Sequence, residues 1–127
     1  QRFEGHEGSL YDVTYNLDRS RLATASGDGT VKIWDTATGK MLFSISNGGA
    51  DFNIVRYHTD GQIIATGDSV GSVKLWDAET GQLLFTLRGH SNLVWSVAFS
   101  PDGQRLATVA SDHSARMWDL ASRETSR

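Results

Sequence analysis

Short segments in which apolar and polar residues alternate recur along the chain, and they predict β-strands. The first kind combines β-branched and aromatic residues and comprises Tyr11–Tyr15, Asn53–Tyr57 and Trp95–Phe99. A second kind follows each of these after a short gap and comprises Arg21–Ala25, Ile63–Gly67 and Arg105–Val109. A period of two places successive side chains on opposite faces of a strand. We therefore expect an all-β fold.

Turn residues separate these segments. The sequences His58-Thr59-Asp60-Gly61 and Ser100-Pro101-Asp102-Gly103 each follow a strand of the first kind. Asp-Gly favours a hairpin because glycine accepts a positive φ without steric cost. A third segment ends in Trp-Asp, and a fourth, apolar segment occurs at Met41–Ile45 and Leu83–Leu87. Each unit therefore predicts four short antiparallel strands joined by tight turns.

The unit repeats with a constant period. The Trp-Asp pairs begin at Trp34, Trp76 and Trp118, so the period is 42 residues. A period of this length is typical of solenoids and propellers. Three units, at about 1–42, 43–84 and 85–127, account for the chain, and we expect a single repeat domain.

The fourth strand of the third unit is unusual. Glu124–Arg127 occupies the place of Lys40–Phe43 but has no apolar residue, and Arg127 falls at the repeat position of Gln1. We expect the last strand to be shared, with Gln1-Arg2-Phe3 of a neighbouring chain completing the strand that Glu124–Arg127 begins.

Composition narrows the function classes. The 127 residues carry a net charge of −3 and include no cysteine. A nucleic-acid partner is not expected, because such proteins usually carry a basic stripe. Disulfides and thiolate metal sites are excluded. No signal-like apolar stretch opens the sequence and no run of about 18 apolar residues occurs, so no membrane partner is expected. The compartment stays open, with the cytoplasm favoured.

Together these residues resemble the WD-repeat family of β-propellers over essentially the whole chain. The resemblance rests on Gly5-His6 and Gly89-His90, on the Asp-containing turns and on the three Trp-Asp pairs, all in register. It implies four-stranded blades arranged as a ring around a channel. Three blades per chain would then form part of such a ring.

The resemblance also implies a buried hydrogen-bond network in each blade, formed by His, Ser or Thr, Asp and Trp. Matched by position, the network residues are His6, Thr24, Asp28 and Trp34 in the first unit, Thr66 and Trp76 in the second, and His90, Thr108, Asp112 and Trp118 in the third. Gly48 and Val70 occupy the two other places of the second unit. We expect the middle blade to lack the network and to rely on apolar packing.

A catalytic interpretation of these residues is disfavoured. His, Thr and Asp repeat with the blade and accompany a Trp that can only donate, which indicates a structural set. A propeller enzyme would need further convergent groups, and Asp51, Asp68 and His58 are spread over different turns of one blade. His58 and His113 are isolated turn residues, so no metal site is expected. We expect no catalysis and no cofactor.

Three blades are too few to close a ring. The terminal units keep apolar residues such as Leu22, Ile33, Leu106 and Met117 and look unlike polar caps. Self-association of identical chains could close the ring. A homotrimer would have nine blades at about 40° per blade, close to the about 45° of eight-bladed propellers. A homodimer would have six blades at about 60° per blade, further from the about 51° of seven-bladed propellers. The homotrimer is therefore slightly favoured. The alternative is a fragment or an engineered piece of a larger WD-repeat protein.

The resemblance implies a protein- or peptide-interaction scaffold. The expected partner face consists of Ser9, Tyr11, Gly27, Asp51, Asn53, Ser69, Leu93, Trp95 and Ser111. Tyr11 and Trp95 are candidate anchors, because aromatic residues often dominate binding. Two alternatives stay open. The aromatic side chains of Tyr11 and Trp95 could pack beside the channel or between blades. The propeller itself could be a self-assembling ring with no ligand.

Overall fold

The computed structural model describes residues 4–6, 8–47, 50–120 and 124–126. The described residues form twelve β-strands in three antiparallel sheets, and each sheet follows chain order as a meander. This confirms the all-β prediction and the four-stranded units.

The strands agree closely with the sequence pattern. The first sheet contains β1 (Leu10–Tyr15), β2 (Arg21–Ser26), β3 (Thr30–Asp35) and β4 (Met41–Ser46). The second contains β5 (Phe52–Tyr57), β6 (Ile63–Asp68), β7 (Val73–Asp77) and β8 (Leu83–Leu87). The third contains β9 (Val94–Phe99), β10 (Arg105–Ala110), β11 (Ala115–Asp119) and β12 (Glu124–Ser126). The units 1–42 and 43–84 therefore end inside β4 and β8.

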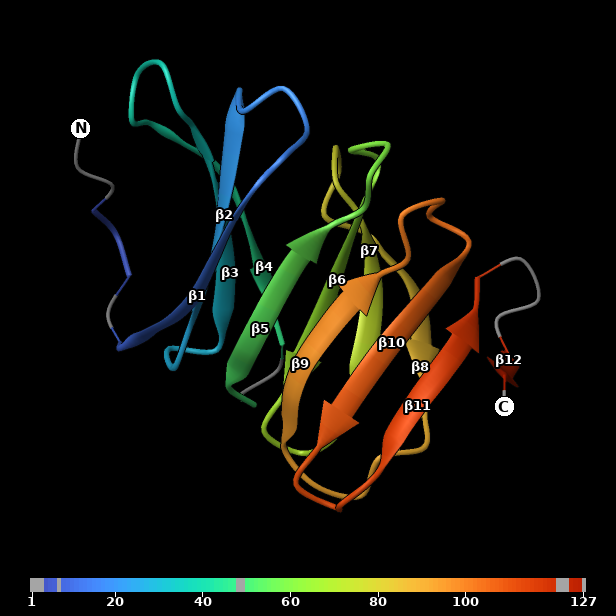
Figure 1. The fold of residues 1–127 in the computed structure, drawn as a ribbon. Coiled ribbons are helices and arrows are strands. Elements are labelled where there is room, and N and C mark those ends of the chain that lie inside the picture. Colours follow the sequence, from blue (N-terminus) through green and yellow to red (C-terminus); the bar gives the residue numbers. More distant parts are fainter. Residues whose placement is uncertain (1–3, 7, 48–49, 121–123, 127) are drawn as a thin grey trace.

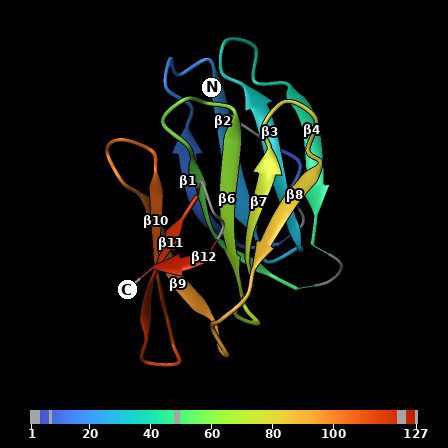
Figure 2. The same cartoon turned by 90° about the vertical axis from the view of Figure 1, so that its right-hand side faces the viewer.

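The three sheets stand side by side with their faces packed together, and the first and third lie at opposite ends of the row (Figure 1). Each acts as one blade. The innermost strands β1, β5 and β9 are neighbours: β5 contacts both β1 and β9. A view turned by 90° shows β10, β11 and β12 on the outer side of the row (Figure 2).

The hydrophobic core lies between the blades rather than inside any one of them. One cluster joins Val31, Ile33 and Ile45 of the first blade to Phe52 and Trp76 of the second. An equivalent cluster joins the second blade to the third. Successive residues of β6 point to opposite faces, with Ile64 in the first cluster and Ala65 in the second, so the middle blade is buried on both sides.

Among the described residues, no such cover lies over the two outer faces of the row. Met117 on β11 is 38% exposed, whereas its repeat equivalent Leu75 is 1% exposed between two blades. On the first blade, Val13 and Tyr15 are exposed in the same way, although the equivalent Val55 is buried. The uncovered faces thus carry the apolar pattern of an interblade contact.

The third blade begins a fourth strand as expected. β12 pairs antiparallel with β11, with Trp118 opposite Thr125. The residues expected to complete this strand, Gln1–Phe3 and Arg127, lie outside the described residues.

Candidate functional site

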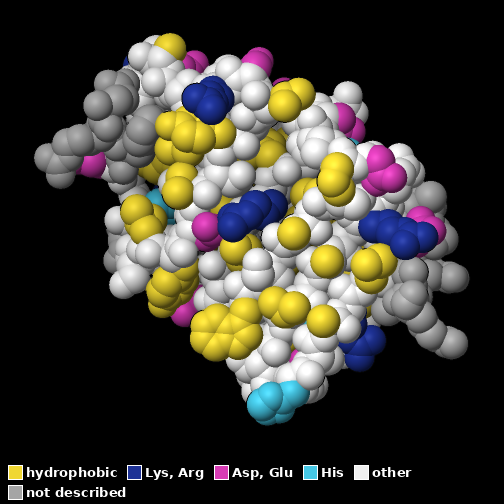
Figure 3. Space-filling view, viewed as in Figure 1, with side chains coloured by type: hydrophobic (Ala, Val, Ile, Leu, Met, Phe, Trp, Pro, Cys, Tyr) yellow, Lys and Arg dark blue, Asp and Glu magenta, His cyan; other side chains and the backbone are white. Residues whose placement is uncertain are grey.

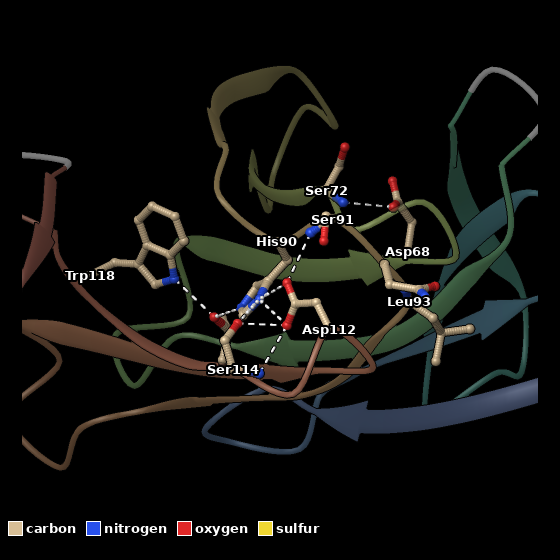
Figure 4. Close-up of polar contacts among 10 residues, drawn as sticks. Asp68, Ser72, His90, Ser91, Leu93, Asp112, Ser114 and Trp118 are labelled. Atoms are coloured by element: carbon tan, nitrogen blue, oxygen red, sulfur yellow. Dashed lines mark hydrogen bonds and ion pairs between the residues drawn. The ribbon is translucent and has the colours of Figure 1, made fainter.

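The polar residues of the third blade form a continuous hydrogen-bonded chain. Trp118 Nε1 donates to Thr108 Oγ1 at 2.9 Å, and Thr108 Oγ1 lies 2.7 Å from His90 Nε2. His90 Nδ1 lies 3.1 Å from Asp112 Oδ2 (Figure 4). The Ser114 hydroxyl and backbone N–H both donate to Asp112 Oδ1.

The first blade repeats this arrangement. Trp34 Nε1 donates to Thr24 Oγ1 at 2.9 Å, His6 Nε2 lies 2.6 Å from the same oxygen, and His6 Nδ1 lies 3.0 Å from Asp28 Oδ2. Trp can only donate and a carboxylate can only accept, so the threonine O–H points to Nε2 and the histidine carries its proton on Nδ1.

In the third blade, hydrogen bonds engage the histidine, threonine and aspartate of the network. Hydrogen bonds from the Ser114 hydroxyl and the Ser91 backbone N–H hold the pKa of Asp112 well below its usual range. The histidine nitrogens and the threonine hydroxyl are all engaged, and Thr108 is buried. These residues stabilise the blade, as a fully satisfied buried network does.

Within the described residues, the middle blade keeps one bond of the His–Thr–Asp–Trp set, but the expectation that it relies on apolar packing is wrong. Trp76 Nε1 donates to Thr66 Oγ1 at 2.9 Å, as in the other blades. In addition, Asp68 is buried and its Oδ2 accepts from Asn47 Nδ2 at 3.0 Å, while Lys74 Nζ donates to Asn47 Oδ1 at 2.8 Å. The middle blade therefore has its own polar set.

In the middle blade, Asp68 accepts the turn hydrogen bonds that Asp112 accepts in the third blade, although Val70 occupies the repeat position of Asp112. Its Oδ1 accepts from the backbone N–H groups of Val70 and Ser72, as Asp112 Oδ1 accepts from Ser114 N. The aspartate thus sits two residues earlier in the repeat. The prediction that Asp68 lies on a turn is wrong, because Asp68 is the last residue of β6 and is buried. Gly48, the position matched to histidine, lies outside the described residues.

The nine residues of the expected partner face occur as three equivalent groups. In each blade the turn after the second strand donates a backbone hydrogen bond to the loop before the first: Gly27 N to Ser9 O, Ser69 N to Asp51 O, and Ser111 N to Leu93 O, at 2.8 to 3.0 Å. These loops lie together at the lower end of the three sheets in Figure 1.

The third member of each group lies at a β-bulge. The register of the first hairpin shifts between Leu10 and Asp12, between Phe52 and Ile54, and opposite Trp95 in the third blade. Bulges re-aim side chains and often occur beside functional sites. Tyr11, Asn53 and Trp95 are the residues that these bulges leave out of the regular pairing.

A groove of about 450 Å³ crosses this end of the molecule. Its walls are Tyr11, Asp51, Asn53, Ile54, Ser69, Leu93, Val94 and Trp95. We call it the three-blade groove, because the lining comes from all three blades. Six of its residues belong to the expected partner face, while Ser9, Gly27 and Ser111 are not part of the lining. Figure 3 shows hydrophobic side chains gathered along the inner strands that border it.

The two candidate anchors differ from core aromatics in their exposure. Trp95 is 65% exposed and Tyr11 50% exposed, whereas Trp34, Trp76 and Trp118 are buried. Gly27 lies directly against the Tyr11 ring, and a Cβ there would come within 3.0 Å of its hydroxyl oxygen. The Tyr11 ring therefore lies over the Gly27 backbone.

Sequence reasoning missed the contacts that fix the first two blades beside this groove. Asp12 Oδ2 accepts from the Val55 backbone N–H at 2.9 Å and also from the Arg56 guanidinium. The corresponding repeat positions hold Ile54 and Ser96, so no repeated signal marked Asp12.

The described residues also line hollows on the end blades, and the one on the first blade, of about 500 Å³, is lined in part by Leu10, Val13 and Leu22. A hollow of about 650 Å³ on the outer face of the third blade, lined in part by Ala107 and Met117, is the uncovered interblade surface already described. His58 Nε2 donates to Gly103 O at 2.8 Å and so joins two turns at the other end of the blades. Among the described residues, no group of three or more potential ligands could hold a metal ion. Within the same ranges, no helix is long and apolar enough to span a bilayer.

Comparisons with known proteins agree on the repeat. The family model described as "WD domain, G-beta repeat" (WD40) matches residues 1–35, 39–77 and 81–119. Eukaryotic translation initiation factor 3 subunit I of Caenorhabditis briggsae is 42% identical over 45 residues, covering 35% of this chain and 14% of that protein. Serine-threonine kinase receptor-associated protein of Dictyostelium discoideum is 44% identical over 45 residues, covering 35% and 15%.

The structural comparison covers more of the chain. The crystal structure of the RRP9 WD40 repeats superposes with a TM-score of 0.94 at 24% identity, covering 98% of this chain and 39% of that one. This likeness concerns the fold alone. The chain spans a small part of the curated relatives' length and about two fifths of this solved structure.

Proposed function

Because the chain belongs to the WD40 repeat family, we propose that it is a non-catalytic scaffold whose three-blade groove binds peptide segments of partner proteins. The observation that carries this proposal is the convergence of six expected face residues from three blades in one groove. The exposed rings of Trp95 and Tyr11 serve as anchors there.

An extended peptide suits the groove for a second reason. Asn53 Nδ2 is buried in the wall with no hydrogen-bond partner among the described residues. Buried donors are normally paired, and leaving one unpaired costs about 1–3 kcal/mol. A peptide carbonyl that enters the wall beside Asn53 would offset this cost.

The absence of catalysis is part of the proposal. It is supported by the engagement of His6, His90 and Asp112 in blade-stabilising hydrogen bonds. The remaining candidates, Asp51 and His58, belong to opposite ends of the second blade, so they do not form an acid–base pair.

The test is a selection of random displayed peptides on the purified chain, followed by affinity measurement on Trp95→Ala. Truncation of an anchor of this kind costs about 2 kcal/mol or more, so we expect binding to weaken at least about thirtyfold. Leu17→Ala is the matched control, because Leu17 is also exposed but lies in the turn between β1 and β2. Selected peptides that bind Trp95→Ala as well as the unchanged chain would overturn the proposal.

We propose further that copies of the chain close the ring, as a single repeat domain over 1–127 whose last strand is shared between neighbours. Support comes from the two outer faces, which carry the apolar residues of an interblade contact and have no cover in the part of the chain that the structure describes. Nine blades in a homotrimer are favoured over six in a homodimer. Light scattering at micromolar concentration measures the mass, and a monomer would overturn this closure.

A second source of the missing blades is a longer chain of which these are three consecutive blades. The match covers only 14% and 15% of the length of two relatives, which favours this alternative. In that case the isolated chain should be monomeric or aggregated, and added flanking blades should restore solubility.

A further inference from the structure

We propose that the three-blade groove selects peptides that carry a basic side chain, Lys or Arg, which it holds between the Trp95 and Tyr11 rings and the Asp51 carboxylate. This inference rests on the proposed function, since it specifies the chemistry of the partner at the same groove. It names a cationic peptide rather than an acidic one or a nucleic acid.

The charge of the lining is the first observation. Among the eight lining residues, Asp51 is the single charged one, and none is basic. An acidic peptide or a phosphate group would meet a like charge and no cation. A basic side chain would instead meet an opposite charge.

The state of the Asp51 carboxylate is the second observation. Asp28, Asp68 and Asp112 belong to turns at the same end of the blades, and each carboxylate there accepts hydrogen bonds that hold a turn. Asp51 contributes its backbone carbonyl to Ser69 N, while its side chain makes no hydrogen bond or ion pair within the described residues. Its carboxylate is therefore available to a ligand.

The two exposed rings are the third observation. Trp95 and Tyr11 line the groove together with Asp51, and the bulges set both apart from regular pairing. A cation over the face of Trp or Tyr is attracted by the ring, and Trp is the strongest partner. The long alkyl stem of Lys or Arg also packs on an aromatic surface while its charged end stays near water.

The test uses the displayed-peptide selection and then one matched peptide pair. We expect the Trp95-dependent peptides to be enriched in Lys or Arg. In a selected peptide, replacement of the basic residue by Gln should weaken binding about tenfold, from the combined ring and carboxylate contacts. Asp51→Asn should weaken the basic peptide about two- to fivefold and leave the Gln peptide unchanged.

Glu79→Gln is the charge-matched control, because Glu79 is an exposed acid in the turn between β7 and β8. It should leave both peptides unaffected at moderate salt. Trp95-dependent peptides without a basic residue, or an equal effect of Asp51→Asn and Glu79→Gln, would overturn the inference and leave the proposed function standing. A selection with no Trp95-dependent peptide would overturn both.

Discussion

At the scale of single residues, one threonine hydroxyl joins the buried tryptophan to the histidine in the first and third blades. Thr108 and Thr66 are equally buried. Thr108 Oγ1 contacts both Trp118 and His90, whereas Thr66 Oγ1 accepts a hydrogen bond from Trp76 and no histidine contacts it among the described residues. The same substitution therefore removes different numbers of contacts in different blades.

Thr108→Val should lower the free energy of unfolding by about 2–4 kcal/mol, because it leaves a buried indole N–H and a histidine nitrogen unpaired. Thr66→Val should cost less, about 1–2 kcal/mol, since one such bond is lost. Urea denaturation of both variants measures the difference. Equal costs would show that the histidine contributes nothing to the blade.

Tyr57 provides a test of stability at alkaline pH. Burial raises the pKa of Tyr57 to about 12 from the ordinary value of 10.0, and its hydroxyl has no partner among the described residues. The unfolded chain therefore ionises first. The stability associated with the neutral ring is fully present below pH 10 and is lost as the pH rises towards 12.

We expect Tyr57→Phe to flatten the decline in stability between pH 10 and pH 12 and to leave the neutral-pH value unchanged or slightly higher. The measurement is a series of urea denaturations across that range. Tyr15→Phe is the control, because Tyr15 is exposed. A parallel decline in the chain with Tyr57 and in the phenylalanine variant would contradict the assignment.

At the scale of elements, the sequence was sufficient for the strands because each blade repeats one alternating pattern and one set of turns. The networks of the outer blades followed from position, since His6 and His90 are equivalent. Asp68 did not, because its function depends on which backbone N–H groups its carboxylate reaches rather than on its repeat number. The signal available in the sequence was an aspartate, Asp68, at the repeat position where β2 ends in Ser26 and β10 in Ala110.

The residues of the three-blade groove were likewise predicted only in part. Repeat positions brought Tyr11, Asn53 and Trp95 into one group, but the pattern of alternation gave no sign of the bulges that set their direction. Ile54 and Val94 were missed as lining residues because they read as core. The Asp12 contact to the second blade was missed because only one blade has it.

The turn between β9 and β10 gives a matched test of packing between blades. Gly103 and Gly61 both have a positive φ, of 72° and 74°. A Cβ at Gly103 would lie 2.6 Å from Cε1 of His58, whereas one at Gly61 would meet nothing within 4 Å. The two glycines thus share the backbone requirement and differ in their surroundings.

Gly61→Ala should cost about 1–2 kcal/mol of unfolding free energy from backbone strain alone. Gly103→Ala should cost about 1–3 kcal/mol more, because His58 must move and its hydrogen bond to Gly103 O is disturbed. Thermal denaturation compares the two variants. Similar losses would indicate that His58 moves aside without cost and that the contact between these turns is unimportant.

At the scale of the whole molecule, the outer faces decide how the chain is used. The core of this fold lies between blades, so a terminal blade satisfies its apolar residues only when another blade covers it. Exposed apolar faces of this kind favour association or aggregation. A charged residue on one outer face should therefore distinguish a cover provided by another copy of the chain from a cover provided by further blades of a longer chain.

Met117→Glu puts a carboxylate at the centre of the third blade's outer face, where Met117 is now accessible. If copies of the chain close the ring, the variant should shift the mass measured by light scattering from a trimer to a monomer. Leu17→Glu carries the same charge on an exposed turn and should keep the trimer. A trimer that survives Met117→Glu would exclude head-to-tail packing through this face, and an unchanged monomer in all three proteins would assign the missing blades to a longer chain.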